Sequence, residues 1–204
     1  MKKLFTFGVT LVAALSLAAC GSSSGSKDSS TTEKATKVDK TSASKVSSKS
    51  SSEKAANQAI PTTADKDWFF NAEKNVFYAG NETMTLTKSE VRDGAETGSK
   101  LLVIYNTIRN NSDEEQDPSN FYMVIHAKQK TDTSNVTLDP GVMGVDDQGN
   151  DPLQAQEDNL NNSLLPGKTV ETVIMFKLEN TNPVTVEFSN ADFEKIGTKT
   201  YDVK

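Results

Sequence analysis

The chain from about residue 64 onward consists of short apolar runs separated by polar turns. Aromatic residues come first, in DWFF (67–70) and VFYA (76–79), with the polar stretch NAEKN between them. Two short apolar runs around such a break predict a β-hairpin. In ETMTLTKSEV (82–91), Met84 and Leu86 alternate with threonines, which is the period of a half-buried strand.

The longest apolar run of this region, KLLVIYNTIRN (100–110), is almost continuous, which favours a strand in the middle of a sheet. Polar turns separate the further predicted strands, which cover residues 121–130, 135–139, 169–178, 184–188 and 199–203. Residues 139–167 have little strand character. Within them, Asp151 as a cap and Pro152 at the first helical position predict one short helix.

This pattern has many short strands, closely spaced turns and no alternation of strands with helices. It is typical of an antiparallel sandwich. We therefore predict an all-β, immunoglobulin-like antiparallel β-sandwich over residues 64–204. The region has no cysteine, so the Cys-Trp-Cys core of antibody domains is excluded, although the wider immunoglobulin-like class is not.

The segment before this domain has a different composition. Residues 21–63 are dominated by Ser, Thr, Lys, Ala and Asp, with few large apolar side chains. Such a segment cannot bury enough apolar surface to offset the entropy of its chain, which predicts a disordered, flexible linker. A wall-binding or O-glycosylated segment is the alternative, because Ser and Thr are dense.

The first residues are typical of an export signal. Lys2 and Lys3 precede a mostly apolar run, residues 4–17, that is too short for a membrane span. An uncleaved anchor is the alternative. The sequence then continues with Leu17, Ala18, Ala19 and Cys20, which resembles the lipobox of bacterial lipoproteins. The resemblance implies a signal peptide over residues 1–19 and a lipidated cysteine that begins the mature chain and its linker, residues 20–63.

Cys20 is the only cysteine of the chain. A cysteine used for lipid leaves the domain without a disulfide, a cysteine nucleophile or a cysteine-based zinc site. Two or three acyl chains anchor a protein stably, whereas one chain binds only marginally. The expected location is the extracytoplasmic face of the cell membrane.

Charge divides the chain in the same place as composition does. Residues 1–63 carry a net charge of +5 and residues 64–204 a net charge of −11. An acidic domain argues against nucleic acid as a partner, because phosphates require a basic face. The basic segment is consistent with a tether close to anionic lipid or cell-wall polymer.

Three motifs extend these observations. The strand KLLVIY runs into Asn110 and Ser112, VTLDPG follows, and PGK at 166–168 precedes a late apolar strand. With the lipobox and the linker, they resemble an immunoglobulin-like lipoprotein family of Gram-positive bacteria catalogued as domains of unknown function. The resemblance covers about residues 68–188. It implies the sandwich and supplies no catalytic residue.

Two acidic loops are the main candidates for a binding site. The first loop contains Asp113, Glu114, Glu115 and Asp117, and the second contains Asp146, Asp147 and Asp151. Clustered carboxylates could hold calcium, which takes six to eight oxygen ligands. However, VDDQGND does not have the spacing of a calcium-binding loop. Solvated loop charge is therefore the default interpretation. A further one is a single acidic rim that faces a basic partner, if both loops lie at the same end.

The histidine and the aromatic residues are weaker candidates for a functional site. His126 is the only histidine and has no nucleophile motif beside it, so a half-exposed strand residue is expected. Trp68, Phe69, Phe70, Phe77 and Tyr78 could form a sugar-stacking platform, but core cover is the stronger expectation.

The sequence predicts a non-enzymatic, lipid-anchored protein without a cofactor. Its partners would be the membrane, through acyl chains on Cys20, and a cell-surface protein or wall component. The alternative is an accessory lipoprotein that binds calcium or a small ligand through the acidic loops. A hydrolase that uses His126 is the third hypothesis.

Overall fold

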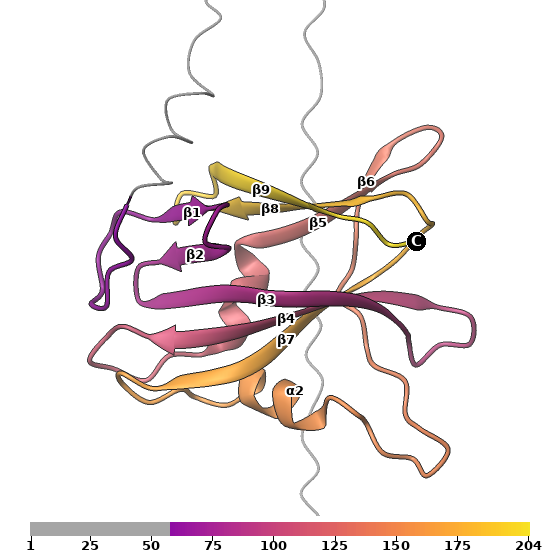
Figure 1. Cartoon of the computed structure of the whole chain (residues 1–204), viewed down its shortest axis with the longest axis horizontal. Coiled ribbons are helices and arrows are strands. Elements are labelled where there is room, and N and C mark those ends of the chain that lie inside the picture. The colour runs from indigo at the N-terminus through magenta and orange to yellow at the C-terminus, as the bar shows by residue number, and fades with distance from the viewer. Residues whose placement is uncertain (1–57) are drawn as a thin grey trace, which may run out of the picture. The chain divides into compact units, whose positions relative to one another are not determined.

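The computed structural model describes residues 58–204. The predicted signal peptide, the lipobox at Leu17–Cys20 and the linker up to residue 57 lie outside the described residues. The described chain forms nine strands in two antiparallel sheets (Figure 1). This arrangement confirms the all-β sandwich.

The first sheet has the strand order β1-β2-β3-β4-β7. Its strands are β1 (Phe69–Asn71), β2 (Val76–Ala79), β3 (Glu82–Asp93), β4 (Lys100–Asn110) and β7 (Thr169–Lys177). The second sheet has the order β6-β5-β8-β9. Its strands are β6 (Asn135–Thr137), β5 (Ile125–Lys130), β8 (Val184–Ser189) and β9 (Lys195–Tyr201). The predicted hairpin is confirmed, because β1 and β2 pair antiparallel through Phe70 and Phe77.

The central position predicted for residues 100–110 is also confirmed, because β4 lies between β3 and β7. Leu102, Ile104 and Ile108 of β4 face the main core between the sheets. Leu101 and Val103 face the other side, where Met143 and other side chains cover them. The run is almost continuously apolar because β4 is buried on both faces.

Three predicted elements are wrong in part. Residues 121–130 do not form one strand: a 3-10 helix, η1 (Pro118–Met123), precedes β5. Asp117 caps this helix by accepting a hydrogen bond from the Ser119 backbone N–H, and Pro118 supplies a fixed φ at its start. The apolar residues Phe121 and Val124 are buried there with helical spacing rather than strand alternation.

The predicted helix exists but begins later. α2 spans Gln154–Asn161, with Leu153 and not Asp151 at its cap. The Asp151 carboxylate instead accepts a hydrogen bond from the Leu153 backbone N–H, 2.7 Å away, in a turn before the helix.

The terminal strand is also displaced, since β9 spans Lys195–Tyr201 rather than residues 199–203.

Candidate functional site

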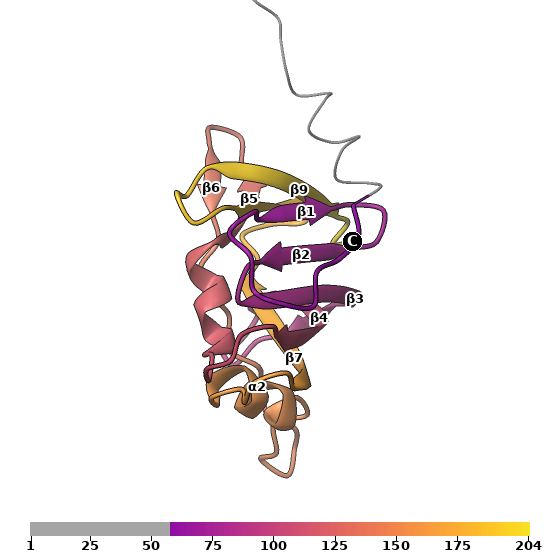
Figure 2. The same ribbon diagram turned by 90° about the vertical axis from the view of Figure 1, so that its left-hand side faces the viewer.

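One end of the sandwich contains a pocket of about 500 Å³, which we call the end pocket. Three segments form it: residues 64–68 before β1, residues 79–82 around the turn between β2 and β3, and a third that contributes Gln116 and residues 120–124 of and after η1. Figure 2 looks at this end, with the segment before β1 in the foreground and the short helix η1 beside the sheets. The lining residues that matter below are Asp65, Lys66, Trp68, Glu82, Phe121 and Met123.

Gly80 makes the close packing of this end possible. It lies in the turn between β2 and β3 with a φ of +69°, a conformation that favours glycine. A Cβ added there would lie 2.7 Å from the Asp65 carbonyl oxygen and 2.8 Å from the Trp68 indole nitrogen. The segment before β1 can therefore approach the turn only because residue 80 has no side chain.

Hydrogen bonds hold this segment in place. The Ala64 backbone N–H donates to the Asn111 carbonyl at 3.0 Å, and the Tyr78 hydroxyl donates to the Thr63 carbonyl at 2.7 Å. The buried Asn111 amide donates in turn to the Gly80 carbonyl at 3.1 Å. These bonds join the start of the domain to the ends of β2 and β4.

Trp68 lies between the core and the pocket. Its ring meets Phe77 edge-on, with 6.2 Å between the ring centroids, and Phe77 meets Phe121 of η1 in the same way at 5.7 Å. Phe77 is fully buried, whereas Trp68 is half-buried and lines the pocket. Core cover is confirmed for the other four aromatic residues, Phe69, Phe70, Phe77 and Tyr78.

Glu82 is the notable polar group of the end pocket. It lies on the inward face of β3, in alternation with Met84 and Leu86, which belong to the main core. Its side chain is only 7% exposed, and its Oε1 atom is buried without a hydrogen-bond partner. Burial, with a smaller contribution from the charge of Asp117, raises the pKa of Glu82 to about 7. None of the ion pairs among residues 58–204 includes Glu82.

The first acidic loop borders this pocket. Asn110, which is fully buried, organises the loop: its amide donates to the Glu114 and Leu164 carbonyls at 2.7 and 2.8 Å. Gln116 then reaches the pocket, where the Asn81 amide donates to its Oε1 at 3.3 Å. The loop carboxylates themselves are exposed: Asp113, Glu114, Glu115 and Asp117.

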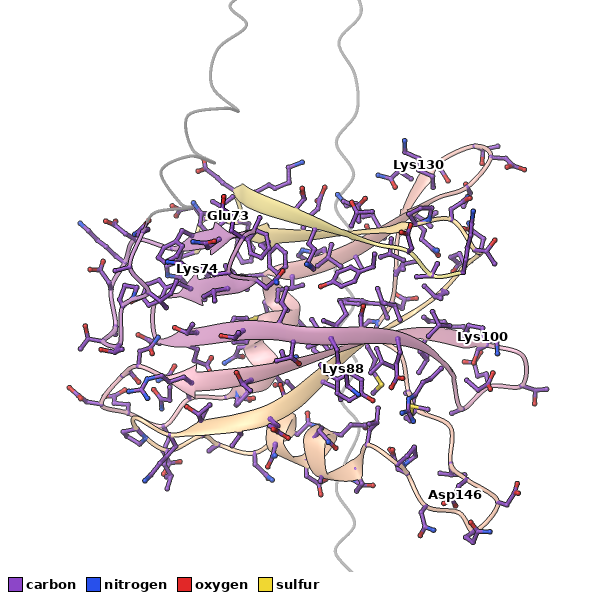
Figure 3. All side chains as sticks on the ribbon, viewed as in Figure 1. Glu73, Lys74, Lys88, Lys100, Lys130 and Asp146 are labelled. Atoms are coloured by element: carbon purple, nitrogen blue, oxygen red, sulfur yellow. The ribbon has the colours of Figure 1, made fainter. Side chains whose placement is uncertain are left out.

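The second acidic loop lies at the opposite end of the sandwich. In the β3–β4 ribbon, Glu82 pairs with Asn110 at one end and Asp93 with Lys100 at the other. Residues 142–144, which precede Asp146, hydrogen-bond to residues 93–95 at this second end. Asp146 and Lys100 accordingly lie on the same side of the molecule in Figure 3. The two loops therefore do not form a single acidic rim. Among the described residues, no three His, Cys, Asp or Glu side chains are grouped so that they could hold a metal ion.

The three acids of the second loop have separate surroundings. The exposed Asp146 carboxylate accepts hydrogen bonds from the Gln148 and Asn150 backbone N–H groups, and these contacts, chiefly those of Asn150, lower its pKa. Asp147 is exposed. Asp151 lies beside Glu157 of α2, and burial, together with the Asp151 charge, raises the pKa of Glu157 to about 7.

Sequence reasoning missed Glu82 and the pocket. A usable signal existed, since an acid stood two residues before Met84 in the register of core-facing positions. His126 is where it was expected: it lies on β5, partly exposed, opposite Glu187 of β8.

Comparison with known proteins gives a family and a fold. The family model described as a domain of unknown function (DUF5067) matches residues 22–190. A "putative lipoprotein" from Staphylococcus aureus has a similar structure, with a TM-score of 0.59, 11% identity, and coverage of 68% of this chain and 93% of its own. A protein from Enterococcus faecalis is similar with a TM-score of 0.54 and 14% identity, over 67% of this chain and 94% of its own.

At sequence identities this low, the two structural similarities establish the fold alone. A comparison with curated proteins found no match. Within residues 58–204, none of the helices has the length and apolar character needed to cross a membrane.

Proposed function

We propose that this chain, which belongs to the family described as a domain of unknown function (DUF5067), is a lipid-anchored extracytoplasmic protein that binds a ligand in the end pocket. The protein does no chemistry on this ligand. The lipobox at Leu17–Cys20 and the immunoglobulin-like class of the sandwich are parts of the same proposal. The structural likeness to a "putative lipoprotein" is consistent with the anchor.

The observation that carries the proposal is the unpaired carboxyl group of Glu82. A buried polar group without a hydrogen-bond partner is costly, so folded proteins retain few of them. A ligand that hydrogen-bonds to Glu82 would remove this cost. The exposed Met123 and the half-buried Trp68 offer apolar contact beside it, which is the usual composition of a small-ligand site.

Site-specific cross-linking in intact cells tests the binding function. A photoreactive residue replaces Met123 at the pocket, where the native side chain is 57% exposed, and in a matched control it replaces Val142, which is 67% exposed at the opposite end. We expect an adduct of defined mass from position 123 and none from position 142. Equal labelling at the two positions, or none at either, would contradict the proposal.

The anchor is tested separately with Cys20→Ala. The variant should leave the membrane fraction or stay unprocessed, because the acceptor of the lipid is missing. Undiminished incorporation of labelled fatty acid would refute the lipidation of Cys20.

A further inference from the structure

The charges around the end pocket favour a cation. Asp65 and Lys66 face it from the segment before β1, and Asp117 acts on Glu82 from the loop before η1. Lys66 is exposed, and the ion pairs among the described residues do not include it. On β4, the partner of Glu82 is the uncharged Asn110. The described domain also carries a net charge of −11 over residues 64–204, which repels anionic ligands.

The pocket is large for a bare metal ion and has no set of metal ligands. Its volume of about 500 Å³ is in the range of small-molecule sites. Glu82 offers one unpaired buried oxygen, where calcium would take six to eight oxygen ligands. The ligand must therefore be larger than a single ion and must have a hydrogen-bond donor for the Glu82 carboxylate.

The apolar side chains that line the pocket suit a ligand whose hydrogen-bond donor is attached to an apolar chain. Phe121 and Met123 line the pocket on the side of η1, and Trp68 lines it on the side of β1. An ammonium group placed over a tryptophan ring is attracted by the negative face of the ring, most strongly where water is excluded. The same ligand can thus pair with the carboxylate and pack against the aromatic side chain.

We propose that the end pocket binds a primary ammonium group on an apolar stem, with the Glu82 carboxylate as its acceptor and the Trp68 ring beside it. This inference rests on the proposed function and names its ligand class. A charge-assisted hydrogen bond satisfies Glu82 better than a neutral donor does. A neutral sugar or alcohol is the competing occupant, and it differs from the amine in carrying no charge.

The pairing makes binding depend on pH. Glu82 must be ionised to attract the ammonium group, and its pKa in the free protein is about 7. A primary amine stays protonated throughout this range, since its pKa is about 10.4. Affinity should fall by about 30-fold between pH 8 and pH 5.5, because a proton then competes with the ligand for the carboxylate.

Trp68 is the only tryptophan of the chain, so its fluorescence reports the pocket directly. The experiment titrates the full chain, in non-ionic detergent, with Nα-acetyl-lysine N-methylamide and with the same compound acetylated at Nε. The two probes share their stem and differ in the ammonium group. We expect at least tenfold tighter binding of the amine at pH 8, a loss of this advantage at pH 5.5, and no advantage in Glu82→Gln.

Glu73→Gln is the matched control, because Glu73 is exposed on the turn between β1 and β2 (Figure 3). It should bind like the native chain. If both probes bind equally and Glu82→Gln changes nothing, the ammonium inference is wrong while pocket binding stands. If neither probe changes the emission of Trp68, the ammonium inference is also wrong, and the cross-linking at position 123 decides the proposed function on its own.

Discussion

The Trp68 indole nitrogen lies so close to Gly80 that a Cβ on the glycine would be 2.8 Å from it. Both residues line the end pocket, and their contact holds the segment before β1 against the turn between β2 and β3. It also joins two segments that the hydrogen bonds of the sheet do not join, since β1 begins at Phe69 and β2 ends at Ala79.

Gly80→Ala should therefore displace the segment before β1. The substitution forces alanine into a left-handed conformation and drives its methyl group into Asp65 and Trp68. We expect a loss of about 3 kcal/mol in the free energy of unfolding. Urea denaturation measures this loss, and a red shift of the Trp68 emission should accompany it as the ring becomes wetter.

The control for Gly80→Ala is Gly149→Ala. Gly149 has a φ of +82°, but its missing Cβ would have no neighbour within 4 Å. This variant should lose only about 1 kcal/mol, the cost of the backbone conformation alone. Equal losses in the two variants would show that the close approach at Gly80 contributes nothing.

The strands were largely predictable because alternation along a strand reports which face is buried. The continuous apolar run of β4 predicted its place in the middle of a sheet. The alternation of Val184, Val186 and Phe188 predicted that β8 is a strand. The 3-10 helix was missed because its apolar residues run directly into β5. Here the local helix cap, Asp117 followed by Pro118, favours a helical turn although the apolar pattern is that of a strand.

The end pocket was not predictable in the same way. Its walls come from segments far apart in the sequence, around Trp68, Glu82 and Phe121, and no local pattern brings them together. One clue was available, because the alternation that placed Met84 in the core also placed Glu82 there. A carboxyl group at an inward position is a conflict between local and global requirements, and such conflicts concentrate at functional sites.

Glu82→Gln should stabilise the domain more at pH 8 than at pH 4.5. The pKa of Glu82 is raised from 4.5 to about 7, so the native state prefers the protonated form. The stability that this preference provides is present below pH 4.5 and is lost as the pH rises through about 7. The difference between native and variant should change by about 3 kcal/mol across this window, as measured by urea denaturation.

Glu157 has a raised pKa of about 7 as well, so the native chain carries two such contributions. Comparison with Glu82→Gln at each pH isolates Glu82, and Glu73→Gln supplies an exposed control. A constant stability difference from pH 4.5 to pH 8 would mean that the pKa of Glu82 is the same in the native and unfolded states, and would contradict its raised value.

Asn110→Asp should loosen the first acidic loop. The Asn110 amide donates to the Glu114 and Leu164 carbonyls, and an aspartate would turn a carboxylate oxygen toward these acceptors. We expect a loss of about 2–3 kcal/mol, measured by thermal denaturation. Faster hydrogen exchange of the Gln116 backbone N–H, which donates to the Leu164 carbonyl at 3.1 Å, should accompany it.

The control for this change is Asn150→Asp on the exposed second loop, where the amide contacts only Asp146. Its effect should stay within about 1 kcal/mol, because solvent screens the repulsion that it introduces between two exposed carboxylates. Undisturbed exchange at Gln116 in Asn110→Asp would contradict the role of Asn110 in holding the loop.

Calcium should leave the melting temperature of the domain unchanged at millimolar concentration. The Asp146 carboxylate already accepts hydrogen bonds from the backbone of its own loop, and the acids of the first loop lie at the opposite end. A stabilising ion would need six to eight oxygens from one place. Differential scanning calorimetry with calcium, and with magnesium as the control, measures this. A rise specific to calcium that Asp146→Asn abolishes would establish the second loop as a calcium site.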